Sequence, residues 1–169
     1  MFNTSVTISG AVSVAMALPD CRIYLNNYGG GSNRVSFSLS KDRKNLVFSG
    51  TVKQADYENI AKLERTQAIE IPANATDENI QPISTMKSLR SISIRNNHNV
   101  TNETVKHLSS LPELQRLELA GCSKLDSKCL ENITSMSILA YLSLPRKGIS
   151  KEAVKELKNK MPDCQIHQH

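Results

Sequence analysis

Residues 114–133 read LQRLELAGCSKLDSKCLENI, and this stretch decides the fold. Leu117 and Leu119 are separated by one residue, so their side chains share one face of a β-strand. Leu130 and Ile133 follow at a spacing of three, which places them on one face of a helix. The stretch therefore predicts a short strand, a loop and a helix.

The strand pattern recurs along the chain at steps of 23, 23, 23, 25, 25 and 24 residues. Its first apolar position is Ile23, Leu46, Ile69, Ile92, Leu117, Leu142 and Ile166. The residue two further on is apolar in every run but the last, where Gln168 stands at what we expect to be a fraying end. The period predicts about seven short strands, each with two side chains directed at a core.

Two further sets of residues, one apolar and one of helix-capping type, repeat with the same period as the strands. Apolar residues between the strands recur at spacings of five, three and three, which predicts one helix in each unit. They are Val52/Tyr57/Ile60/Leu63, Ala75/Ile80/Ile83/Met86, Val100/Val105/Leu108/Leu111, Leu125/Leu130/Ile133/Met136, and, with one longer step, Val6/Ala11/Val14/Leu18 and Ile149/Val154/Leu157/Met161. Residues of N-cap type precede the helices at Thr7, Thr76, Thr101, Asp126 and Ser150.

One unit departs from this pattern. Residues 26–45 keep the repeat length but lose the helical set, and Val35, Phe37 and Leu39 alternate at period two. We expect this irregular turn to place an extended strand where its neighbours place a helix. The rest of residues 1–169 is expected to form one repeat domain around it.

Units of this size cannot bury both apolar faces alone, so they must stack in register. The opening stretch resembles the cysteine-containing leucine-rich repeat, through Leu114, Leu117, Leu119, Cys122, Leu125 and Leu130, and residues 89–108 match with Asn97 near the Asn/Cys position. The resemblance, which includes bacterial-type repeats, covers about 46–166 well and 1–45 loosely. It implies an α/β leucine-rich-repeat solenoid: a curved right-handed β-α superhelix with a parallel sheet on its concave face and helices on its convex face.

Bulk composition narrows the class of protein. The 169 residues carry a net charge of +5, with a basic patch at Lys147, Lys151, Lys155, Lys158 and Lys160. Glu152 and Glu156 interleave with these lysines, so we interpret the patch as a solvated helix face with i,i+4 ion pairs, not as a nucleic-acid site. The longest apolar run, 15–18, is too short to span a bilayer. We expect a cytoplasmic protein, with a secreted protein or effector as the alternative.

The sequence contains few residues that could form a catalytic or metal-binding site. Cys21, Cys122, Cys129 and Cys164 lack zinc-site spacing, and we expect Cys122 to be structural, Cys129 to be semi-exposed and Cys21 to lie far from Cys164. His167 and His169 are interpreted as a solvated tail. No Ser/His/Asp set, HExxH or dinucleotide motif occurs. We predict no enzyme activity, no cofactor, no metal and no small-molecule substrate.

Binding is the remaining class of function. Leucine-rich repeats usually bind partners through the strand residues that flank the inward pair. In this chain those flanking residues carry both positive and negative charges, which suits a protein partner. The predicted partner-binding residues are Ser93, Arg95, Arg116, Glu118, Tyr141, Ser143 and Arg146. The alternative is a substrate-recognition or sensor part of a larger enzyme, such as a ubiquitin ligase or kinase. Association of copies through the solenoid ends is a further expectation.

Overall fold

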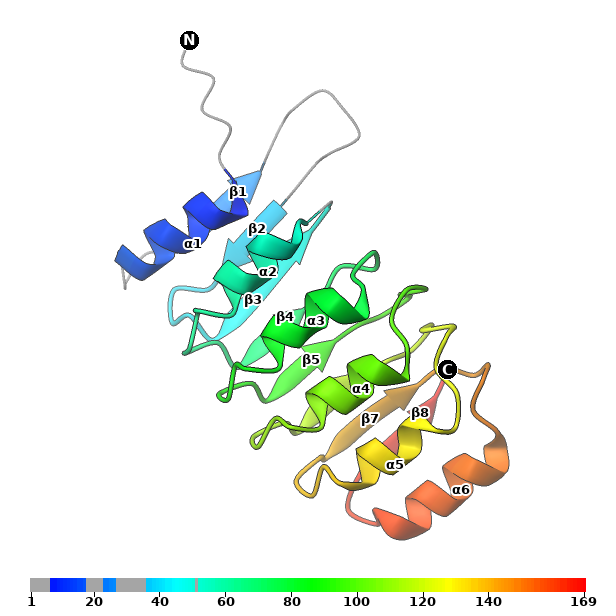
Figure 1. Ribbon diagram of the computed structural model, residues 1–169. Helices are drawn as coiled ribbons and strands as arrows, with labels where there is room; N and C mark the ends of the chain where they lie inside the picture. The colour runs from blue at the N-terminus through cyan, green and yellow to red at the C-terminus, as the bar shows by residue number, and fades with distance from the viewer. Residues whose placement is uncertain (1–6, 18–22, 27–35, 51) are drawn as a thin grey trace.

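The structure is a computed structural model that describes residues 7–17, 23–26, 36–50 and 52–169. Helices and strands alternate along most of this length (Figure 1). The elements are α1 (Ile8–Ala17), β1 (Ile23–Asn26), β2 (Ser36–Leu39), β3 (Asn45–Ser49), α2 (Gln54–Ile60), β4 (Ala68–Glu70), α3 (Asp77–Ile83), β5 (Ser91–Ser93), α4 (Asn102–Leu108), β6 (Arg116–Glu118), α5 (Cys129–Thr134), β7 (Tyr141–Leu144), α6 (Lys151–Lys160) and β8 (Gln165–Gln168).

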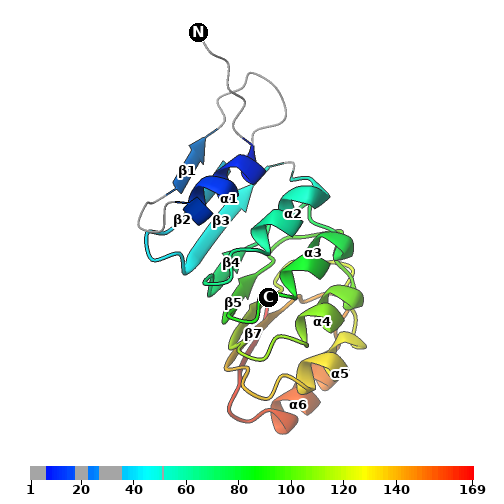
Figure 2. The ribbon, with the colours of Figure 1, turned by 60° about the vertical axis from the view of Figure 1, so that its left-hand side comes forward.

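The strands form one eight-stranded sheet in chain order. From β3 to β8 all neighbours are parallel, and the predicted column pairs with itself one coil on: Leu46, Ile69, Ile92, Leu117, Leu142 and Ile166 are successive partners. The helices α2 to α6 form a second layer along one side of this sheet (Figure 2). This arrangement is a leucine-rich-repeat solenoid, and the fold prediction is confirmed.

A single core runs between the two layers. Both inward positions of the strands are buried from β3 to β7, and the predicted apolar positions of the helices are buried or partly buried from α2 to α6. Each fully buried Leu or Ile side chain contributes roughly 1.5–3 kcal/mol relative to exposure. Because every coil supplies the same positions, the core continues through the stack without a break. Helices are wider than strands, so the sheet takes the concave side of the stack.

The irregular unit differs from expectation in its placement. A strand does occur within 26–45, at Ser36–Leu39, but β2 lies in the sheet and not in the helix layer. It is antiparallel to both β1 and β3, and its Phe37 and Leu39 are buried. The strand at 23–26 is therefore separated from β3 by β2, whereas the period alone would have made them neighbours. An antiparallel pair needs only a short connection, which this unit supplies.

The first helix turns a different face inward from the one predicted. Its buried residues are Ile8, Ala11, Val12 and Ala15, whereas Val14 is 45% exposed. Val6 and Leu18 of the predicted set lie outside the described residues. The helix contacts α2 through Ser9, whose hydroxyl donates to Asp56 at 2.9 Å.

The last helix lacks the predicted i,i+4 ion pairs. The described residues contain four ion pairs, and none of them includes a residue of α6. Among the helices described, none is long and apolar enough to cross a bilayer.

Thr76, Thr101 and Ser150 stand directly before their helices as predicted, whereas α5 is preceded by Lys128 and not by Asp126. Ser150 accepts from the Ala153 amide at 3.1 Å and Thr101 from the Glu103 amide at 3.2 Å. Asp77 joins two coils, because both its oxygens accept hydrogen bonds from the amides and hydroxyls of Thr101 and Thr104. Burial alone would raise the pKa of Asp77, but these hydrogen bonds outweigh it and hold the pKa below its ordinary value of 3.8.

Asp77→Ala is expected to lower the free energy of unfolding by about 1–3 kcal/mol at neutral pH, because four donors lose a charged acceptor. Since the pKa of Asp77 is lower in the folded state, its contribution is full at neutral pH and is lost as the pH falls through the folded-state value. Urea unfolding at several pH values should show the gap to wild type closing below about pH 4. The control Asp163→Ala, at an exposed position, should change stability by less than about 0.5 kcal/mol. A gap for Asp77→Ala that does not vary with pH would contradict the role given to the carboxylate.

Candidate functional site

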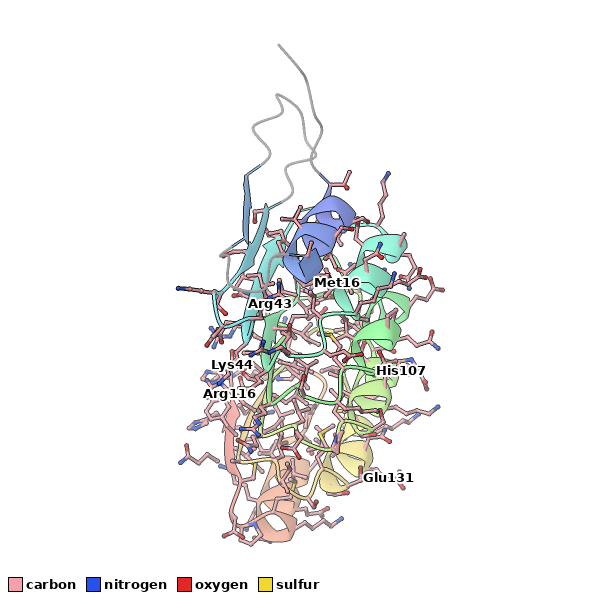
Figure 3. The ribbon with its side chains drawn as sticks, turned by 90° about the vertical axis from the view of Figure 1, so that its left-hand side faces the viewer. Met16, Arg43, Lys44, His107, Arg116 and Glu131 are labelled. Atoms are coloured by element: carbon pink, nitrogen blue, oxygen red, sulfur yellow. The ribbon has the colours of Figure 1, made fainter. Side chains whose placement is uncertain are left out.

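The face of the sheet that the helices leave uncovered, here called the open sheet face, carries two polar columns in its C-terminal half. Strand register sets Ser91, Arg116, Tyr141 and Gln165 side by side in one column. It sets Ser93, Glu118, Ser143 and His167 side by side in the other. These side chains alternate with the inward aliphatic pair, so the same period that builds the core also aligns them. Arg116 lies on the strand side of the molecule, opposite His107 and Glu131 of the helix layer (Figure 3).

Glu118 is the centre of a cluster of four residues, here called the Glu118 cluster: Ser93, Arg95, Arg116 and Glu118. Only 7% of the Glu118 side chain is exposed, yet it lies on the open sheet face. Arg116 donates to one carboxylate oxygen through Nε at 2.7 Å and through its terminal nitrogen. Arg95 forms an ion pair with the other oxygen, which also accepts from the Ser93 hydroxyl at 3.3 Å. One buried carboxylate thus holds two guanidinium groups in place.

The ionisation of Glu118 follows from these contacts. Burial alone would raise its pKa, but the hydrogen bonds and charge of Arg116, followed by the charge of Arg95, lower the pKa of this carboxyl below its ordinary value. The carboxylate is therefore charged at neutral pH. Arg95 and Arg116 remain 58% and 43% exposed, so two positive groups against one negative group leave the cluster with a net charge of +1 on its outer side.

Planar side chains continue from the cluster toward the last strand. The Arg116 guanidinium lies 3.8 Å from the centre of the Tyr141 ring, which is a cation–π contact. The Tyr141 and His167 rings are 5.3 Å apart, and His167 and His169 are 6.1 Å apart. Four flat side chains from β6 to the end of β8 therefore form a continuous strip.

The predicted site residues divide into three groups. The structure brings together Ser93, Arg95, Arg116, Glu118 and Tyr141. Ser143 lies in the same column but is only 3% exposed, so it offers little surface to a partner. Arg146 is exposed beyond β7, and its backbone amide donates to the carbonyl of His169.

The histidines were missed by the sequence analysis, which interpreted them as a solvated tail. His167 lies within β8, and residues 165–168 pair with β7 in register, so the predicted fraying end is instead a strand. The signal was present, because His167 stands 24 residues after Ser143 and 49 after Glu118 in the same period. Within the described residues, no three His, Cys, Asp or Glu side chains gather in a way that would hold a metal ion.

The cysteines of the described chain belong to the core. Cys122 is buried and donates to the Ile94 carbonyl of the preceding coil at 2.9 Å. Cys129 is also fully buried, so the expectation of a semi-exposed thiol is wrong. Burial raises the pKa of the Cys122 thiol to about 11 and, with the nearby Asp126 charge, that of Cys129 to about 12. Both are thiols at neutral pH and are poor nucleophiles. Cys21 lies outside the described residues, so its predicted separation from Cys164 is untested.

Several solved structures are similar to this chain. The chain is similar to a leucine-rich-repeat protein of Leptospira interrogans, at 22% identity and a TM-score of 0.48 over 69% of this chain. The chain spans 28% of the length of that protein. No protein-family model matches the chain, and no curated protein matches it. At this level of likeness the fold rests on the strand register described above.

Glu118→Gln is expected to lower the free energy of unfolding by about 1–3 kcal/mol, because two guanidinium groups lose their charged partner while the side-chain shape is kept. Glu113→Gln is the matched control. Its ion pair with Arg90 is 3.6 Å long and half-exposed on both sides, so the change should stay below about 1 kcal/mol. Chemical unfolding at neutral pH compares the two variants. If both variants lost the same small amount of unfolding free energy, Glu118 would not be the central residue of the cluster.

Labelling of the native protein with iodoacetamide at about pH 8 should leave Cys122 and Cys129 unmodified, because both are buried with raised pKa values. Mass spectrometry of the digested protein identifies each modified site. Both thiols should react once urea has unfolded the chain. Rapid modification of Cys129 in the native protein would show that this thiol is accessible and would reopen a nucleophilic role for it.

Proposed function

We propose that this chain is a non-catalytic binding module that engages another protein through the open sheet face. The observation that carries the proposal is the Glu118 cluster, in which a buried carboxylate holds Arg95 and Arg116 in fixed positions. Long cationic side chains lose conformational entropy when they bind, and groups that are already held lose less. A pre-positioned pair of guanidinium groups is therefore suited to recognition.

The composition of the face supports a protein as the partner. Arg and Tyr are enriched among the residues that dominate binding energy at protein interfaces. Here Arg116 stacks on Tyr141, and His167 extends the flat surface by one coil. The contact residues we propose are Arg95, Arg116, Tyr141, Arg146 and His167.

Charge narrows the chemistry of the partner. Arg95 and Arg116 exceed Glu118 by one charge, and Arg146 adds a further exposed cation. Guanidinium groups bind carboxylates through paired hydrogen bonds. The partner surface should therefore present Asp or Glu side chains opposite β5 to β7, with an aromatic or apolar group over Tyr141.

A photo-crosslinking amino acid in place of Tyr141 tests this proposal in extracts of the source cells. The same amino acid in place of His107, which is also half-exposed but lies on the helix layer, is the matched control. We expect a defined protein adduct from position 141 alone. Adding Arg116→Glu to the position-141 protein should reduce the adduct by about tenfold or more, since a central interface charge is reversed. Equal adducts at the two positions, or an adduct that Arg116→Glu leaves unchanged, would contradict binding through the open sheet face.

A further inference from the structure

A small cavity lies where three segments of the N-terminal half meet: the end of α1, the turn between β2 and β3, and the connection from α2 to β4. Its volume is about 180 Å³, and its lining includes Met16, Arg43, Lys62, Arg65 and Thr66. Figure 3 labels Met16 and Arg43, which lie next to each other at this place. The space, here called the Arg43 cavity, is large enough for several water molecules or for one small anion. It shares no residue with the Glu118 cluster.

Two of the lining residues stand at a repeat position that later coils fill with leucine. This position comes three residues before the first inward residue of each strand, and in three successive coils it is a buried leucine: Leu89, Leu114 and Leu139. In the two coils before them the same position is Arg43 and then Thr66. Because β3, β4 and β5 pair in register, these two polar residues are neighbours in the stack. They interrupt the leucine column at the cavity.

Neither of these polar residues has a partner for its buried polar atoms. Within the described residues, the buried side-chain nitrogen and oxygen atoms that lack a hydrogen bond are Nε and Nη2 of Arg43 and Oγ1 of Thr66. Thr66 as a whole is 0% exposed. Burying donors without partners is costly, and it is most costly for a charged group. Apolar side chains would avoid this cost, as the leucines of the later coils do. The two residues therefore call for a partner from outside the chain.

The unpartnered atoms of Arg43 are the two that bind oxyanions in pairs. Nε and Nη2 form one edge of the guanidinium group, and their N–H bonds point in the same direction. Arg116 uses this same edge to donate to the Glu118 carboxylate in the open sheet face. An oxyanion in the Arg43 cavity can accept the same two hydrogen bonds, and the Thr66 hydroxyl offers it a third donor.

The charge of the lining favours a doubly charged anion. Arg43, Lys62 and Arg65 are three cations and Glu64 is one anion, which leaves a net charge of +2 around the cavity. None of the four ion pairs found in the described parts of the chain includes any of these residues. The Lys62 ammonium donates to the neutral amide of Asn59 at 2.7 Å, so its charge is not cancelled. A phosphate monoester carries about two negative charges at neutral pH, whereas a carboxylate carries one.

The turn between β2 and β3 holds Arg43 in a conformation that few residues adopt. Its φ is 60°, in the left-handed region that favours glycine. The Arg43 amide donates to the Ser40 carbonyl at 2.9 Å, and the Lys44 amide donates to the Asp42 carboxylate at 3.1 Å. These bonds fix the turn although its Arg43 backbone is strained. Strain of this kind is concentrated at functional sites, and here it falls on the residue whose guanidinium lines the cavity.

We propose that the Arg43 cavity binds a phosphate group, either as free phosphate or as the phosphate end of a small monoester. Arg43 donates to the phosphate through Nε and Nη2, and the Thr66 hydroxyl donates to a further oxygen. Lys62 and Arg65, which are exposed, balance the remaining charge at the rim. The site is independent of protein binding through the open sheet face, so either proposal can fail without the other.

Isothermal titration calorimetry of the full chain with inorganic phosphate, phenyl phosphate and acetate, at neutral pH and constant ionic strength, tests this. At least one of the two phosphate compounds should bind about tenfold or more tightly than acetate. Tighter binding of phenyl phosphate would identify a monoester as the ligand, and equal or tighter binding of inorganic phosphate would identify free phosphate. Arg43→Met should weaken binding by about tenfold or more. The matched control is Lys41→Met, an exposed residue of the same turn outside the cavity lining, which should stay within about twofold of wild type.

Thermal melts of Thr66→Val add a readout with the opposite sign. Valine keeps the shape of threonine and removes the unpartnered hydroxyl. In phosphate-free buffer the variant should therefore melt about 2 °C or more above wild type. In calorimetry it should bind the phosphate compound about threefold or more weakly than wild type. A gain in stability together with a loss of binding is the result expected of a residue kept for a ligand.

Three results would overturn the proposal. The first is no binding of either phosphate compound, or acetate binding as tightly as both. The second is Arg43→Met binding phosphate as well as Lys41→Met does. The third is a lower melting temperature for Thr66→Val without phosphate, because it would show that the hydroxyl already has a partner in the folded chain. The melts also confirm that each variant is folded, so that lost binding is not lost fold.

Discussion

The structure depends on one constraint, which is that each coil must repeat its inward side chains in register with the coil before it. Ile92, Leu117 and Leu142 are direct partners across parallel strands, and each is fully buried. A shift of one residue in any strand would turn its inward pair to solvent. The same register carries the outer residues with it, so Glu118 and its neighbours meet because the core requires that spacing. The arrangement of the open sheet face thus follows from the spacing that builds the core.

Much of the fold could be predicted because two periods, one for strands and one for helices, agree in phase over several coils. The features that could not be predicted lie in segments where the strand and helix periods no longer agree. Alternation at Phe37 and Leu39 indicates a strand but does not name its partner, so its place in the sheet was missed. In α1, Val12 and Val14 are equally apolar, and the sequence cannot choose between the faces that they occupy. Cys129 was misplaced because it adjoins the helix column without belonging to it.

The candidate site was predictable in position but not in chemistry. The outer column follows from the strand period, and five of the seven predicted residues lie together. The sequence does not reveal that Glu118 is buried, because burial there results from Arg95 and Arg116 closing over it. The strand period includes His167, which stands 24 residues after Ser143, but Gln168 breaks the apolar pair and led to the interpretation of a fraying tail. In the structure, the Gln168 side-chain amide donates to the carbonyl groups of Pro145 and Ile149.

Methyl–methyl nuclear Overhauser contacts in a protein labelled at isoleucine and leucine methyl groups test the register most directly. Coils stacked in register should give contacts from Ile92 to Ile69 and Leu117, and from Leu142 to Leu117 and Ile166, each joining residues one coil apart. Contacts that skip a coil, or that link any of these residues in an antiparallel order, would contradict the stacked register. The proposal of binding through the open sheet face would then lose its basis.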